Sequence, residues 1–229
     1  LKMNIEVKNS EKPVDYLQSI KILEKRADDV FLGKKDELLW ILEHNTVYTA
    51  GKSAKEKDLI DKNVHVIKTN RGGKYTLHAP GQKVIYFVIN LNNREKDIRK
   101  FINKIELCIM KILKEYNVKS HTDSKNIGIW VNSKNKTKKI AAIGVRVKKW
   151  IAYHGFSLNV NTDISYYDHI IPCGIKGVEI TSMSALAGRP LDLQDVRKQV
   201  ALSFAECWGF VSYELTEFEF QDALTQVGH

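Results

Sequence analysis

The sequence predicts a fold of the α/β (α+β) class, built on a mixed β-sheet flanked by helices. Three observations lead to this prediction. Short apolar runs rich in β-branched and aromatic residues, such as 84–91, have the length and composition of strands. Two longer segments, 97–116 and 193–208, repeat apolar residues at helical spacing. Some strand-like runs follow one another through polar loops and others through helices, which favours a mixed sheet over a regular βαβ array.

The first half of the chain is expected to supply a helix followed by strands. Apolar residues at three-residue spacing predict an amphipathic helix over 14–28, namely Val14, Leu17, Ile20 and Leu23. The continuous apolar run 38–42 predicts a buried strand, and 64–67 predicts another. The run 84–91 is expected to form a central strand.

The second half is expected to begin with the longest helix, which follows Asp97 and ends near Tyr116. Strands are predicted over 127–131 and 140–147, with the polar stretch 132–138 as the hairpin loop between them. Two further strands are expected over 150–153 and 156–160. A final helix is predicted over 193–208, with Asp192 as its N-cap.

Length and composition favour one large domain, or one domain with a small appendage, since 229 residues with 43% hydrophobic content can bury a large core. No apolar run approaches the ~20 residues of a membrane span, so no membrane association is expected. No signal peptide is visible. The formal net charge of +9 comes mainly from scattered lysines without interleaved aromatic residues, which argues against a nucleic-acid partner.

The cysteines bear on location and cofactors. An odd count of three, with no CxxC pair, predicts free thiols in a reducing cytoplasm. No cysteine or histidine cluster has zinc-ligand spacing, so neither a metal nor another cofactor is expected. Cys108 and Cys207 fall on helix faces and are interpreted as small buried hydrophobes.

A glycine-rich segment, 71–82, lies between two predicted strands. Its paired glycines, Gly72 and Gly73, allow a backbone to approach a ligand closely, and Arg71 and His78 supply hydrogen-bond donors beside it. An ordinary glycine- and proline-containing loop is the alternative.

A second segment, 138–144, places Lys139 at the start of an apolar strand. A lysine there could serve as an acid or base, or stabilise an anion. Taken in isolation, an exposed lysine at the end of a lysine-rich hairpin is the simpler interpretation.

The third segment is a Pro-Cys-Gly turn at 172–174. Pro172 fixes the entry to the turn, and Gly174 leaves room for a substrate carbonyl. A free thiol is only a few per cent ionised at neutral pH, and a neighbouring ammonium raises that fraction. Cys173 is therefore the candidate nucleophile and Lys139 its candidate neighbour.

A fourth segment begins with His154 and Gly155 and continues as an apolar strand to residue 160. A structural histidine and a pocket histidine are equally compatible with this pattern. The remaining histidines considered have no supporting motif and are interpreted as surface or packing residues; they are His44, His65, His121 and His169.

Together and in this order, the four segments resemble the lipoyl(octanoyl) transferases of lipoate biosynthesis. The family's arginine-glycine-glycine loop is similar to 71–82, its lysine-isoleucine segment to 139–144, its histidine-glycine strand to 154–160 and its proline-cysteine-glycine turn to 172–174. Ala79 departs from the pattern, because the family usually has glycine there.

The resemblance covers about residues 10–210 and implies a single catalytic acyltransferase domain over 1–229 with that core. Its fold would be biotin/lipoyl protein ligase-like, with Cys173 as the acyl-thioester nucleophile and Lys139 as its acid/base partner. It also implies a set of substrate-binding residues: Arg71, Gly72, Gly73, Lys74, Tyr75, Thr76, Leu77, His78, Ala142, Ile143, Gly144, His154, Gly155, Phe156 and Ser157. Backbone N–H groups near Gly174, or in the 139–144 segment, are candidate oxyanion donors.

The implied reaction transfers an octanoyl or lipoyl group from acyl carrier protein to a lysine of an acceptor domain. Acceptors would be the lipoyl domains of 2-oxoacid dehydrogenase complexes and the H protein of glycine cleavage. Because such partners tend to be acidic, the positive charge would steer them to the cleft. Two alternatives remain at this point. An ATP-dependent lipoate or biotin ligase of the same fold would need no nucleophilic cysteine, and a non-catalytic basic binding module would not need Cys173 and Lys139 to meet.

Overall fold

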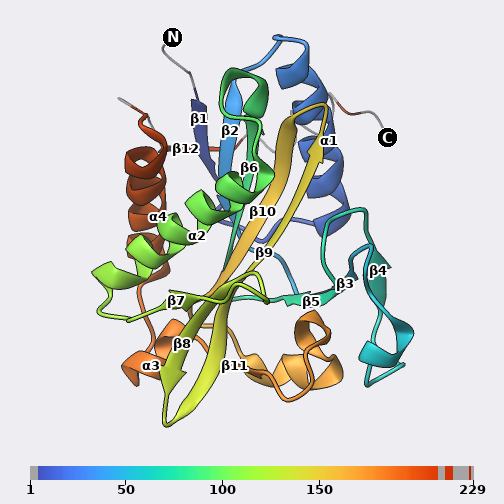
Figure 1. Ribbon diagram of the computed structural model, residues 1–229, viewed down its shortest axis with the longest axis vertical. Coiled ribbons are helices and arrows are strands. Elements are labelled where there is room, and N and C mark those ends of the chain that lie inside the picture. Colours follow the sequence, from blue (N-terminus) through green and yellow to red (C-terminus); the bar gives the residue numbers. More distant parts are fainter. Residues whose placement is uncertain (1–4, 211–214, 219–226, 228–229) are drawn as a thin grey trace.

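A computed structural model describes residues 5–210, 215–218 and 227 of the chain. Among these residues, a nine-stranded mixed sheet runs in the order β12-β1-β2-β6-β10-β9-β8-β7, with β11 added beside β9 (Figure 1). Its strands are β1 (Ile5–Asn9), β2 (Glu37–Leu42), β6 (Gln82–Asn90), β7 (His121–Thr122), β8 (Ile129–Ser133), β9 (Lys136–Lys148), β10 (Ile151–Asn159), β11 (Glu179–Ile180) and β12 (Leu215–Glu217). This architecture confirms the predicted fold class.

Pairing within the sheet is parallel at one edge and antiparallel in the middle. β1 pairs in parallel with both β2 and β12. β6 pairs antiparallel with β2 and with β10, which makes it the central strand that its composition predicted. The parallel pair β11–β9 places Ile180 beside Lys139.

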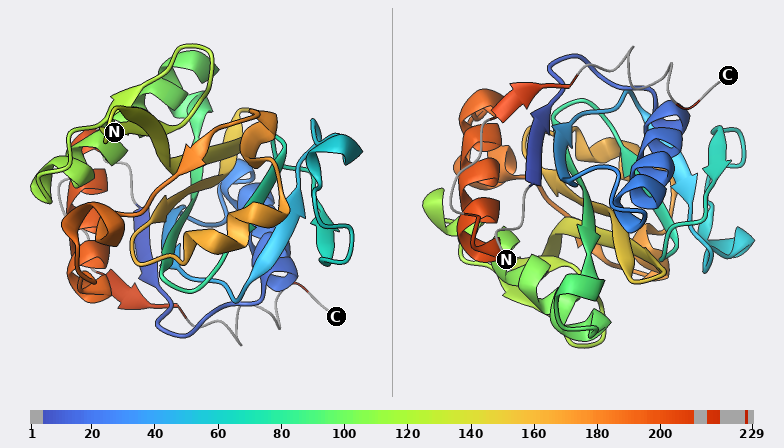
Figure 2. Two further views of the ribbon diagram at one scale, coloured as in Figure 1. Left: turned by 90° about the horizontal axis from the view of Figure 1, so that it is seen from below. Right: turned by 90° about the horizontal axis from the view of Figure 1, so that it is seen from above.

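Helices cover both faces of the sheet. On one face lie α2 (Ile98–Glu115) and α4 (Leu193–Trp208), and on the other lies α1 (Tyr16–Phe31) (Figure 2). Alternate residues of β6 therefore enter two different cores. Ile85 and Phe87 pack under α2 and α4, whereas Val84 and Val88 pack under α1. Because both faces are covered, β2 and β6 read as continuous apolar runs instead of alternating ones.

A smaller sheet stands beside the main one. Among the described residues it has three strands in the order β4-β3-β5, which are β3 (Val47–Ala50), β4 (Val66–Lys68) and β5 (Tyr75–His78). Leu77 of β5 packs with Tyr48, Tyr167 and Ile170 in a third apolar cluster. The cluster includes Ile164 and Tyr167 of η3 (Ile164–His169) and Leu59, the residue after η1 (Glu56–Asp58), and β5 also packs against η4 (Pro172–Gly174). The other short elements are η2 (Leu91–Asn93) and α3 (Met183–Ala187).

The long helices begin where the sequence predicted. Asp97 caps α2 by accepting a hydrogen bond from the Lys100 N–H, and Asp192 caps α4 through the Gln194 N–H. The helix predicted from residue 14 starts at Tyr16, after Asp15 as N-cap. The prediction that Leu17 lies on the buried apolar face of this helix was wrong, because Leu17 is 52% exposed. A strict three-residue step falls 60° short of a helical turn each time, so such a row of residues drifts off the buried face.

The predicted strand boundaries need two corrections. The hairpin loop expected over 132–138 contains only Lys134 and Asn135, because Asn132 and Thr137 already pair in the ladder. Both loop residues have positive φ, as a two-residue hairpin turn requires. The two strands expected over 150–153 and 156–160 are one continuous strand, β10, with His154 and Gly155 in its middle.

Candidate active site

The structure brings Lys139 and Cys173 into contact. Lys139 Nζ lies 2.9 Å from Cys173 Sγ and 2.9 Å from the backbone oxygen of Ile127. Lys139 is only 3% exposed, and its ammonium lies 5.3 Å from the centre of the Trp130 ring. Gly128 makes room for the lysine, since a Cβ there would stand 2.4 Å from Lys139 Cε. The amine is therefore held in one place by a carbonyl, a ring and a sulfur.

Cys173 lies half-buried in η4, in a turn that is tightly tethered. Its own φ of 57° falls in the left-handed region, which costs a non-glycine residue about 1–3 kcal/mol. The Ile171 N–H donates to the Asp58 backbone oxygen at 2.7 Å, and the Gly174 N–H donates to the Ile171 oxygen at 2.9 Å. These bonds offset the strain and orient the sulfur toward Lys139. The Gly174 N–H is engaged in its bond to Ile171, so a backbone oxyanion donor near Gly174 or in the 139–144 segment stays a prediction.

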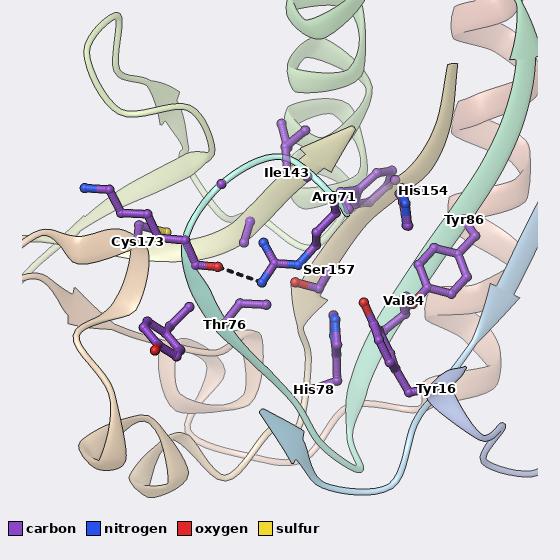
Figure 3. Close-up of a pocket in the computed structure, with 17 residues that line it drawn as sticks. Tyr16, Arg71, Thr76, His78, Val84, Tyr86, Ile143, His154, Ser157 and Cys173 are labelled. Atoms are coloured by element: carbon purple, nitrogen blue, oxygen red, sulfur yellow. Dashed lines mark hydrogen bonds between the residues drawn. The ribbon is translucent and has the colours of Figure 1, made fainter. Parts of the chain in front are cut away.

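A narrow cleft leads away from Cys173. Its volume is about 60 Å³. Figure 3 shows Cys173 at one end and Tyr16 and Tyr86 at the other. The lining residues are Tyr16, Arg71, Gly73, Lys74, Tyr75, Thr76, His78, Val84, Tyr86, Ala142, Ile143, Gly144, His154, Gly155, Phe156, Ser157 and Cys173. Val84, Ala142, Ile143 and Phe156 make the walls apolar, so the cleft suits an unbranched hydrocarbon chain.

The close packing of strands shapes this cleft. A Cβ on Gly155 would stand 1.9 Å from the Ile85 backbone oxygen, so only glycine allows β10 to approach β6 there. Register then sets Ser157 beside Val84 and Gly155 beside Tyr86. Two β6 side chains thereby become part of the cleft wall.

Arg71 organises the glycine-rich loop from within. It is 7% exposed, and its guanidinium donates to the Thr49 oxygen at 3.0 Å and to the Lys74 oxygen at 2.7 Å (Figure 3). A further bond reaches the Gly72 oxygen at 2.8 Å. Burial lowers the pKa of Arg71, and its neighbours Tyr16 and Cys173 act in the opposite direction. Its guanidinium thus holds the loop closed around a positive charge.

The histidines near the cleft are neutral. Burial lowers the pKa of His44 to about 4 and those of His78 and His154 to about 3. His78 Nδ1 lies 2.7 Å from Gln82 Oε1, which can only accept, so His78 donates. His44 contacts the Val14 oxygen and the Tyr86 hydroxyl, which makes it a packing histidine as the sequence suggested. None of these rings carries the second ring proton of an imidazolium at neutral pH.

The structure places most of the predicted substrate-binding residues on the cleft, but not all of them. Gly72 is absent from the lining, because its backbone oxygen is turned toward Arg71. Leu77 is also absent, since alternation along β5 directs it into the third apolar cluster. Sequence reasoning missed Tyr16, Val84 and Tyr86. For Val84 and Tyr86, the one indication in the sequence was that alternate residues of a strand share a face.

Metal and membrane features are absent from the described part of the chain. No group of three or more His, Cys, Asp or Glu side chains there is arranged to hold a metal ion. Nor does any helix within those residues have the length and apolarity to cross a membrane.

The chain is similar to known proteins in both sequence and fold. The family model of the lipoyl protein ligase A/B catalytic domain matches residues 15–205. An octanoyltransferase from Wolbachia pipientis subsp. Culex pipiens is 43% identical, covering 81% of this chain and 92% of the relative. An octanoyltransferase from Jannaschia sp. is 40% identical, covering 87% and 97%.

Solved structures share the fold at low sequence identity. A putative lipoate protein ligase from T. acidophilum with bound lipoic acid has a TM-score of 0.72 at 15% identity, covering 99% of this chain and 94% of that one. A lipoate-protein ligase A bound with ATP has a TM-score of 0.71 at 14% identity, covering 99% and 93%.

Proposed function

The chain belongs to the lipoyl protein ligase A/B catalytic domain family and is an octanoyltransferase of lipoate biosynthesis, and we propose that it carries the acyl group on Cys173 between acyl carrier protein and a lipoyl domain. The observation that supports this mechanism best is the 2.9 Å contact between Lys139 Nζ and Cys173 Sγ at the end of an apolar cleft. The two side chains are proposed to act as a nucleophile and its acid/base partner.

The first half-reaction is a thioester exchange. Lys139, in its neutral form, takes the thiol proton, and the Cys173 thiolate attacks the carbonyl carbon of the octanoyl thioester. The bond from that carbon to the carrier sulfur breaks, and the carrier thiolate takes the proton back from Lys139. One thioester replaces another of similar energy, so the step needs no ATP and no cofactor.

The second half-reaction forms an amide. The acceptor lysine gives one ammonium proton to Lys139, and its amine attacks the acyl carbon on Cys173. The carbon–sulfur bond breaks, the attacking nitrogen loses its second proton to the departing Cys173 sulfur, and Lys139 releases to solvent the proton that it took from the ammonium. A thioester becomes a more stable amide, which drives the transfer. General acid–base help of this kind contributes about 10²- to 10⁴-fold.

The apolar cleft is proposed to hold the acyl tail. Arg71, Lys74 and His78 surround it at the loop side, and Ile143 and Phe156 at the strand side. Burying each methylene of the tail contributes about 0.8 kcal/mol. This recognition is independent of the partner proteins, so the same cleft serves both half-reactions.

Partner domains and location complete the proposal. One solved relative of the fold, at a TM-score of 0.71 and 12% identity, is described as a bipartite lipoate protein ligase with its E2 lipoyl domain. Lipoyl domains of 2-oxoacid dehydrogenase complexes and the glycine cleavage H protein are the proposed acceptors, with octanoyl-acyl carrier protein as the donor. The reaction is placed in the cytoplasm, where free thiols persist.

Intact-mass analysis tests the mechanism. The chain is incubated with octanoyl-acyl carrier protein in the absence of ATP, alongside a Cys173→Ser variant. The expected result is a gain of one octanoyl group in the parent protein and none in the variant. An ATP requirement for acylation of the acceptor would contradict the proposal and favour a ligase.

A further inference from the structure

One oxygen of a buried carboxylate lies beside the nucleophile turn without a hydrogen-bond partner among the described residues. Asp58 is 4% exposed, and within the described part of the chain its Oδ2 makes no hydrogen bond. This oxygen lies 2.9 Å from the point where a Cβ on Gly174 would stand. A buried carboxylate that lacks a partner is costly, so its retention calls for a function.

A lysine ammonium already approaches the same place. Lys74 Nζ lies 2.7 Å from that Cβ point on Gly174, yet no ion pair joins it to Asp58 within 4.0 Å. Gly174 has φ +62° and no side chain, so the space beside the turn can admit the end of a lysine. Lys74 thus shows that a primary ammonium fits next to both the Asp58 carboxylate and the residue after Cys173.

From this arrangement we infer that Asp58 binds the ammonium of the acceptor lysine before it attacks the acyl group on Cys173. The inference rests on the proposed function and adds a binding group for its second substrate. The acceptor lysine displaces Lys74 from the space beside Gly174 and takes up the Asp58 contact. Its proton then passes to Lys139, and its nitrogen attacks the acyl carbon as the bond from that carbon to Cys173 breaks.

Charge around the sulfur explains why such a group is needed. Arg71 and Lys74 line the cleft that ends at Cys173. These cationic side chains favour a thiolate and a developing oxyanion, but they repel an incoming ammonium. The Asp58 carboxylate, on η1 beside the turn that carries the nucleophile, offsets that repulsion. A carrier-protein thioester has no ammonium, so the first half-reaction does not need this residue.

The Asp58 backbone has a separate structural role. Its oxygen accepts the Ile171 N–H at 2.7 Å, which ties η1 to the nucleophile turn. Asp58→Asn keeps this bond and the side-chain shape, and it removes only the negative charge. The substitution therefore separates ammonium binding from support of the turn.

Single-turnover measurements on Asp58→Asn test the inference. Formation of the octanoyl-enzyme, followed by intact mass, should match the parent protein, because it depends on Cys173 and Lys139. Transfer from the preformed octanoyl-enzyme to a lipoyl domain should show a half-saturating concentration raised about tenfold or more. Deacylation by hydroxylamine, which is uncharged at neutral pH, should be unchanged.

Asp61→Asn is the matched control, since Asp61 lies on the same segment but pairs with His169 at the surface. It should behave as the parent protein in every assay. Unchanged transfer to the lipoyl domain in Asp58→Asn, or an equal loss with hydroxylamine, would overturn the inference while leaving the cysteine mechanism intact. Failure of the parent protein to form an octanoyl-enzyme would instead overturn the proposed function.

Discussion

At the scale of single residues, the contact between Lys139 and Cys173 depends on features that the sequence shows only in part. The Pro-Cys-Gly order predicted a turn, and the lysine was predicted at the start of a strand, whereas β9 already begins at Lys136. Their proximity, across 34 residues of sequence, comes from the pairing of Ile180 with Lys139 and from the Thr181 N–H bond to the Lys139 oxygen at 2.9 Å. β11 is only two residues long, which is too short for apolar periodicity to predict a strand.

Replacing Lys139 should slow acylation of Cys173. Lys139→Gln is expected to reduce the single-turnover rate at pH 7 by about 10²- to 10⁴-fold, because the thiol loses its acid/base partner. The loss should shrink as the pH rises toward about 8.5, where an unassisted cysteine ionises by itself. Rates measured from pH 6 to pH 9 check this. Lys138→Gln is the control, since the Lys138 ammonium lies 2.9 Å from a Glu179 carboxylate oxygen and does not contact the sulfur. A similar rate for both variants would contradict the acid/base role.

Val84 should limit the length of acyl chain that the cleft accepts. It lines the cleft on β6, and Val84→Phe adds bulk inside a narrow space. Octanoyl transfer should fall relative to hexanoyl transfer by about fourfold for each methylene that no longer fits. Competition between the two carrier thioesters measures the ratio. Val88→Phe is the matched control, because Val88 lies on the same face in the same core but outside the cleft. An equal shift in both variants would mean that general overpacking, and not the cleft, sets the preference.

At the scale of elements, the long helices and the strand interiors were predictable, and the strand ends were not. The long helices show a strong apolar repeat and an aspartate N-cap, so α2 and α4 were placed almost to the residue. β8 and β9 run further into their hairpin than predicted because polar residues at its solvent end still pair through their backbones. Backbone hydrogen bonds leave no trace in side-chain hydropathy, so composition alone ended these strands too early.

The turn between β8 and β9 offers a test at this scale. Lys134 and Asn135 have φ values of 50° and 61°, which asparagine tolerates and glycine adopts freely. Replacing the pair with Asn-Gly should raise the free energy of unfolding by about 0.5–1 kcal/mol, measured by urea denaturation. Asn132→Gly, within β8, should lower it by a similar amount. A decrease from the Asn-Gly replacement would show that the turn is not of the predicted type.

At the scale of the whole molecule, one central strand joins the two cores and the active site. β6 presents Ile85 and Phe87 to one core, Val88 to the other, and Val84 and Tyr86 to both a core and the cleft. The wall of the cleft is therefore also part of the hydrophobic core, which keeps the wall rigid. It also brings His44, His78 and His154 out of water. These rings link the stability of the molecule to pH.

The free energy of unfolding should fall as the pH drops from about 6.5 toward 4. The folded-state pKa values of the three histidines, about 4, 3 and 3, lie below the ordinary value of 6.5. The unfolded chain therefore binds protons first on acidification, and stability present above pH 6.5 is progressively lost until the folded rings protonate. Each ring contributes up to about 1.4 kcal/mol per pH unit. Urea unfolding at pH 7, 6 and 5 measures the slope, and His154→Gln should reduce it by about a third. A free energy that stays level from pH 7 to pH 5 would mean that the buried rings take up protons in the folded protein.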